Sequence, residues 1–151
     1  MTHPLHPLTV HFPIALLFTS VFFDLLGMLT DNNNFRQTGW WLLILGLIGG
    51  TVAAGIGMWT EEQIEAMGVP EAAVDRHEAF AVTTMIVFAV LAVIRWWRRG
   101  RWSARDRVVY LSVAMAGLLL LGITGFYGGE LVYRYGAGVQ SSAAPRPANP
   151  D

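Results

Sequence analysis

Two histidines, His11 and His77, lie near the starts of the first and third of four apolar segments. If all four segments cross a bilayer, the first and third run parallel, so both imidazoles reach the same face of the membrane. A b-type haem needs two axial nitrogens on opposite sides of its ring, and facing helices can supply them without a covalent attachment motif. The placement therefore predicts one haem b between His11 and His77, and with it a role in electron transfer.

Polar residues at the same face are candidates to complete this haem site. Arg76 and Arg134 are expected to pair with the haem propionates, and Glu130 to orient an imidazole N–H. No histidine falls near the opposite ends of the segments, so a second haem is not predicted. Electrons would then pass to a quinone in the membrane or to a periplasmic redox protein.

Two other interpretations fit these residues. A zinc or copper site could use His6, His11 and His77, because nitrogen and oxygen ligands suit these ions. Alternatively, the histidines lie at the headgroup interface, where an amphipathic ring is at home. The chain is then a structural or accessory subunit of a larger membrane complex, or a homo-oligomer. Either way an electron carrier or accessory protein is favoured over a stand-alone enzyme, and no basic stripe typical of nucleic-acid binding appears.

The segments that position these residues are predicted to be transmembrane helices. Segments 8–29, 38–58, 78–97 and 108–127 are each roughly long enough for a hydrocarbon core of ~30 Å. A chain of 151 residues with 54% hydrophobic and 14% charged residues has too little polar surface to cover a soluble domain. We predict an all-α, integral membrane four-helix bundle over residues 1–136, embedded in the lipid bilayer. Residues 137–151, rich in Gly, Ser, Ala and Pro, are expected to form a disordered tail.

Charge asymmetry predicts the orientation of the bundle. The loop 60–78 carries six acidic residues and one arginine, so it should face outward. Both termini are then external. Six of the ten positive charges flank the loop between the third and fourth segments, which the positive-inside rule places in the cytoplasm: Arg95, Arg98, Arg99, Arg101, Arg105 and Arg107.

One carboxylate falls inside the first apolar segment. An ionised group at the depth of Asp24 is costly and usually faces a partner or a water path. Arg95, expected at a similar depth on the third helix, is the favoured partner. An ion pair is therefore preferred over a proton relay.

Small residues recur every four positions along the second segment. Such stripes allow close approach of helix backbones, so tight helix packing is the favoured interpretation over clearance for a ligand. The two stripes are Gly46, Gly50 and Ala54, and Gly49, Ala53 and Gly57.

Four sequence segments resemble a bacterial family of small four-helix membrane proteins catalogued as a domain of unknown function. They are the opening HPLTVHFPIALL, the triplet from Asp24 to Leu26, the region around His77 and the ending GGELVYRYGAGV. The resemblance implies a bundle in the bacterial inner membrane whose histidines are suspected haem ligands, as in cytochrome b-type bundles. It also implies that relatives neighbour redox domains such as Rieske proteins. By position it points to His11 and His77, with His6 and Glu130 as accessory residues.

Overall fold

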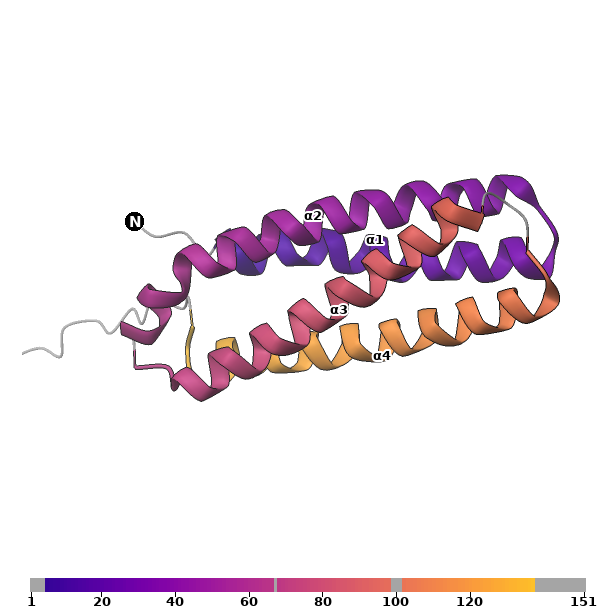
Figure 1. Cartoon of the computed structure of the whole chain (residues 1–151). Coiled ribbons are helices and arrows are strands. Elements are labelled where there is room, and N and C mark those ends of the chain that lie inside the picture. Colours follow the sequence, from indigo (N-terminus) through magenta and orange to yellow (C-terminus); the bar gives the residue numbers. More distant parts are fainter. Residues whose placement is uncertain (1–4, 67, 99–101, 138–151) are drawn as a thin grey trace, which may run out of the picture.

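Four long helices make up the part of the chain that the computed structural model describes, residues 5–66, 68–98 and 102–137. The side chains of residues 5–8 and 61–63 are outside this description. Each helix contains a candidate membrane span by length and composition, so the all-α, multi-pass prediction is confirmed at this level. In chain order the helices are α1 (Leu5–Leu29), α2 (Asn33–Ala66), α3 (Glu71–Arg98) and α4 (Ala104–Tyr133) (Figure 1).

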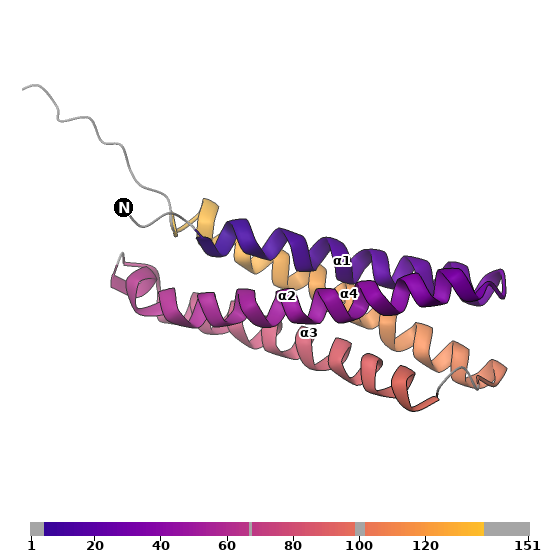
Figure 2. The ribbon, with the colours of Figure 1, turned by 90° about the horizontal axis from the view of Figure 1, so that it is seen from above.

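The helices form two hairpins that pack against each other. α1 packs along α2 and α3 packs along α4, while α2–α3 and α1–α4 contacts close the ring. α1 and α3 therefore lie diagonally across the bundle. Figures 1 and 2 show the four helices running roughly along one common axis, with the short α1–α2 and α3–α4 connections at one end.

Every helix extends beyond the apolar segment that predicts it. α3 begins directly after Pro70, whose carbonyl oxygen accepts hydrogen bonds from the amides of Ala73 and Val74. α4 begins with a capping box, in which Ser103 and Asp106 satisfy each other's backbone amides. Polar turns thus continue the helices past the hydrocarbon core, which a count of apolar residues does not detect.

The interior of the bundle is narrow, and much of its outer surface is apolar. Leu17, Leu43, Phe88 and Leu91 are almost completely buried at its centre. Large apolar side chains such as Phe18, Ile48, Val93 and Leu119 are exposed around the outside. A helix bundle that is apolar on its outer faces is solvated by lipid rather than water.

Three glycines of the α2 stripes pack inside the bundle, whereas Ala54 of the same stripes is exposed. A Cβ added at Gly46 would lie 2.7 Å from the Leu17 side chain, and one at Gly50 would lie 2.6 Å from Met85 Sδ. Gly49 faces Pro13. The prediction of tight packing is confirmed at these glycines, so this part of the α2 surface is not a face for an external partner.

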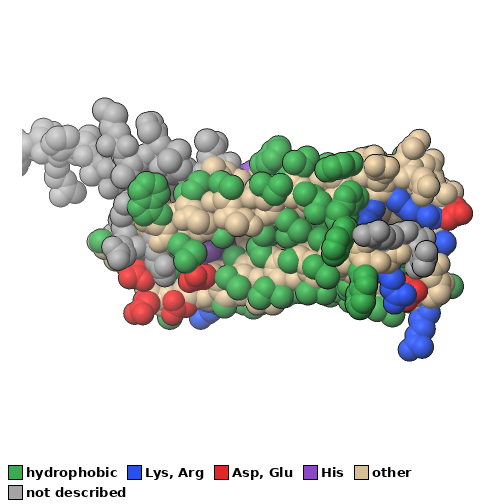
Figure 3. All heavy atoms as spheres, turned by 45° about the horizontal axis from the view of Figure 1, so that its top comes forward, with side chains coloured by type: hydrophobic (Ala, Val, Ile, Leu, Met, Phe, Trp, Pro, Cys, Tyr) green, Lys and Arg blue, Asp and Glu red, His purple; other side chains and the backbone are tan. Residues whose placement is uncertain are grey.

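Opposite charges gather at the two ends of the bundle (Figure 3). We call the end with the α1–α2 and α3–α4 connections the arginine end, and the end with the α2–α3 connection the acidic end. Ala137, the first residue of the predicted disordered tail, is buried beside Leu131 and Val69 at the acidic end. The rest of that tail, residues 138–151, lies outside the described residues.

Candidate functional sites at the two ends of the bundle

Asp24 is the centre of a buried polar network at the arginine end. Asp24 is 1% exposed. Arg95 donates from Nη1 to Oδ1, and the Tyr110 hydroxyl donates to Oδ2 at 2.7 Å. One carboxylate on α1 thus holds side chains from α3 and α4, and both of its oxygens are hydrogen-bonded.

The Arg95 guanidinium extends the network to the remaining helix. Its Nη2 donates to the backbone carbonyl of Arg36 in the first turn of α2. The same guanidinium lies 5.9 Å from the centre of the Trp40 ring, within reach of a cation–π contact. All four helices therefore meet at this ion pair.

A glycine makes room for the Asp24 carboxylate. A Cβ built on Gly39 of α2 would overlap Asp24 Oδ1 and would lie 3.0 Å from the carbonyl oxygen of Ser20. Any side chain at this position would push α2 away from α1. The close contact between α1 and α2 thus depends both on the Asp24 carboxylate and on the absence of a side chain at Gly39.

A cleft of about 680 Å³ opens above this network at the arginine end. All four helices or their connections contribute to its walls. Basic and aromatic side chains dominate them, namely Arg36, Arg95, Arg107, Trp40, Trp96 and Trp102.

At the acidic end His77 packs onto α4. Its Nδ1 lies 3.2 Å from the backbone carbonyl of Thr124, and a Cβ at Gly128 would lie 3.0 Å from the ring carbon Cε1. Two turns further along, the hydroxyls of Thr84 and Thr124 are hydrogen-bonded at 2.9 Å. His77 therefore takes part in a polar contact line that joins α3 to α4.

Of the remaining residues proposed for the haem site, Arg134, Glu130 and Arg76 contact other protein side chains, and His11 is exposed on α1. Arg134 donates to Glu130 at 2.6 Å, one turn apart on α4. The Arg76 guanidinium lies 5.5 Å from the centre of the Tyr127 ring.

These positions allow a test of the haem prediction. The contact of His77 Nδ1 with a backbone carbonyl is the kind that orients a ligating imidazole. However, the His77 ring packs against α4, and the exposed His11 side chain is not enclosed in a pocket. The described side chains thus show no assembled bis-histidine site, and we derive no redox step from them.

The metal prediction depends in part on residues outside the description, because the side chain of His6 is among these. Among the described residues, no group of three or more His, Cys, Asp or Glu side chains is placed to hold a metal ion. A zinc or copper site that includes His6 stays a prediction.

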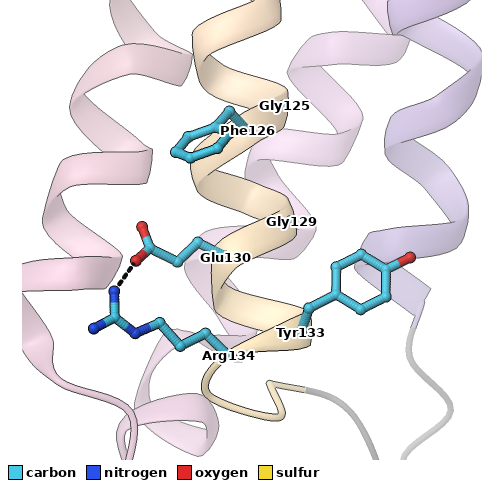
Figure 4. A pocket seen from close by; sticks show the side chains of 6 residues that line it. All are labelled: Gly125, Phe126, Gly129, Glu130, Tyr133 and Arg134. Atoms are coloured by element: carbon cyan, nitrogen blue, oxygen red, sulfur yellow. Dashed lines mark hydrogen bonds and ion pairs between the residues drawn. The ribbon is translucent and has the colours of Figure 1, made fainter.

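A shallow groove of about 470 Å³ runs along the outer face of α4 near the acidic end (Figure 4). Its floor is open, because a Cβ at Gly125 would meet no atom within 4 Å. The side chains of Phe126 and Tyr133 are strongly exposed beside it. The groove is lined by Gly125, Phe126, Gly129, Glu130, Tyr133 and Arg134.

Neither the role of Tyr110 nor this groove was predicted from the sequence, although a sequence pattern indicates each of them. Tyr110 lies near the start of the fourth apolar segment, at the end of the bundle where Asp24 and Arg95 are expected. Gly125 and Gly129 have the four-residue spacing of a helix-docking motif, GFYGG.

Four long apolar helices with a lipid-type outer surface define a multi-pass integral membrane protein. The chain belongs to the family described as predicted membrane protein (DUF2231), whose model matches residues 2–141. Comparisons with the curated proteins and with the solved structures gave no match.

Proposed function

We propose that this chain is a structural or accessory membrane protein. It assembles with a second copy of itself through the α4 groove. The single observation that carries the proposal is the groove itself, whose open glycine floor lies beside the exposed rings of Phe126 and Tyr133. Gly46 and Gly50 of α2, by contrast, are packed against neighbouring helices. At Gly125 the helix backbone is open on a lipid-facing surface, where a second helix can approach closely.

The chemistry of the groove favours a second copy as the partner. Glu130 and Arg134 form an ion pair at its rim (Figure 4). In a two-fold contact the same surface meets itself. Glu130 and Arg134 of the two copies would then lie at the same depth, one helical turn apart, while Phe126 and Tyr133 bury their exposed rings.

Replacing Gly125 and Gly129 together by leucine is expected to weaken self-association at least roughly tenfold, about 1.4 kcal/mol. Two leucine side chains would fill the groove and hold the helices apart. Light scattering of the purified protein in neutral detergent, over a range of protein-to-detergent ratios, measures the oligomeric state.

Gly55→Leu is the matched control, because a Cβ at this exposed position on α2 also meets no atom within 4 Å. It should leave self-association unchanged. A monomeric wild-type protein, or equal effects of the α4 and α2 variants, would contradict assembly through the groove.

A second candidate is the haem-binding electron carrier. It is supported by the contact between His77 Nδ1 and the Thr124 carbonyl, which is of the kind that orients a ligating imidazole. His11 would have to turn toward the space between α1 and α3 to become the second ligand. Bound haem would supply one-electron chemistry, and Arg76 and Arg134 would hold its propionates.

Oxidised and dithionite-reduced absorption spectra of protein purified from haem-replete cells test this candidate. Haem ligation predicts a b-type difference spectrum that is lost in both His11→Ala and His77→Ala. A featureless spectrum of correctly folded protein would refute it, and copurifying zinc or copper would instead support the metal interpretation.

We also propose an orientation in which the arginine end faces the cytoplasm of a bacterial inner membrane and both termini face outward. The charge difference between the two ends supports this topology. Labelling of single introduced cysteines from each side of the membrane tests it, since the chain has none of its own.

A further inference from the structure

The cleft at the arginine end has the composition of a site for an anionic headgroup. Three guanidiniums line it, from α2, α3 and α4, beside three tryptophans. Asp24 neutralises Arg95 in the buried ion pair, so the charge available to a ligand comes from the other two guanidiniums, Arg36 and Arg107.

The carboxylate of Asp31 lies near two arginines of the cleft. Its carboxylate contacts Arg36 and lies 3.6 Å from Arg107. Yet its side chain is 76% exposed, and its backbone has a φ of 53°, which is unusual for a residue with a side chain. The short connection between α1 and α2 thus places an exposed carboxylate between two arginines of the cleft.

We propose that the cleft binds the phosphate of an anionic phospholipid, and that Asp31 is an internal competitor for the same two guanidiniums. This inference is independent of assembly through α4 at the other end of the bundle. Guanidiniums bind phosphate oxygens through paired hydrogen bonds, and basic pockets between transmembrane helices are typical sites for anionic headgroups.

The aromatic walls favour a lipid over free phosphate as the source of the anion. Tryptophan is enriched at the level of the headgroups, where its ring faces acyl chains and its N–H faces water. Trp96, which lines the cleft, is 63% exposed. A phosphate held by the arginines would therefore have apolar surface next to it for the attached chains.

Binding can be measured by native mass spectrometry of the full chain from micelles that contain equal amounts of phosphatidylglycerol and phosphatidylcholine. We expect the wild-type protein to retain phosphatidylglycerol preferentially. Arg107→Gln should weaken this binding about fivefold, the loss expected for one basic residue near a lipid phosphate. Arg105→Gln, an exposed neighbour that does not line the cleft, is the matched control.

Asp31→Asn should have the opposite effect and strengthen phosphatidylglycerol binding about fivefold, because it removes one competing charge. Equal retention of the two lipids, or equal losses from Arg107→Gln and Arg105→Gln, would overturn the lipid site. Weaker or unchanged binding by Asp31→Asn would overturn the competitor role alone. Displacement of the lipid by millimolar inorganic phosphate would show that free phosphate is the ligand. Thermal melting of each variant shows whether a loss of lipid binding results from unfolding of the protein.

Discussion

Asp24→Leu is expected to lower the free energy of unfolding by about 3 kcal/mol, because it leaves the Arg95 charge without its carboxylate inside the bundle. Broken buried ion pairs typically cost about 3–5 kcal/mol. We expect the lower end of this range because Arg95 lines the cleft and can turn toward its opening. Titration with a denaturing detergent, followed by circular dichroism, measures the effect.

The double variant Asp24→Leu/Arg95→Leu distinguishes the loss of the ion pair from the cost of leaving Arg95 unpaired. Since it removes both charges, it should regain much of the stability that the single variant loses. Arg98→Gln, in an ion pair whose arginine is half exposed, should change stability little. If Asp24→Leu were as stable as the wild type, the four-helix network would not hold the bundle together, and a proton-carrying role for Asp24 would regain support.

The arginine end illustrates what the sequence can and cannot predict. The cost of an ionised group in an apolar segment makes Asp24 conspicuous and requires a cation at similar depth, which leaves Arg95 as the natural choice. The Tyr110 hydroxyl and the Arg36 carbonyl are not conspicuous, because tyrosine is ordinary near a helix end and every residue has a carbonyl. Their roles depend on how the helices rotate about their axes, which the positions of apolar residues do not determine when all faces are apolar.

The acidic end shows the same limit for the histidines. Chain order places His11 and His77 on one side of the membrane. It predicts the depth of the two residues but not the directions in which their side chains point. Whether two side chains face each other depends on rotation of each helix by a fraction of a turn. Here His77 contacts α4 through Thr124, and His11 is exposed. Equal depth was therefore a weaker argument for a shared site than the buried charge was for an ion pair.

The second large effect is expected at Gly39, where alanine should lower the free energy of unfolding by about 2–3 kcal/mol, as for overpacking of a rigid core. The added methyl group would overlap Asp24 Oδ1 and lie 3.0 Å from a backbone carbonyl of α1. Neither atom can move freely, since one is held by Arg95 and the other belongs to a helix backbone. Relief would require α1 and α2 to separate.

Two other glycines of α2 provide a graded control for Gly39→Ala. At Gly50 the added methyl would meet Sδ and Cε of Met85 at 2.6 and 2.8 Å, the flexible end of a side chain that can turn aside. At Gly55 it would meet no atom within 4 Å, so the higher helix propensity of alanine should leave stability unchanged or raise it slightly. Detergent denaturation should therefore rank the losses as Gly39 first, Gly50 second and Gly55 last. A loss at Gly39 no larger than at Gly50 would mean that α1 and α2 can shift at the Asp24 contact, and that the ion pair tolerates the movement.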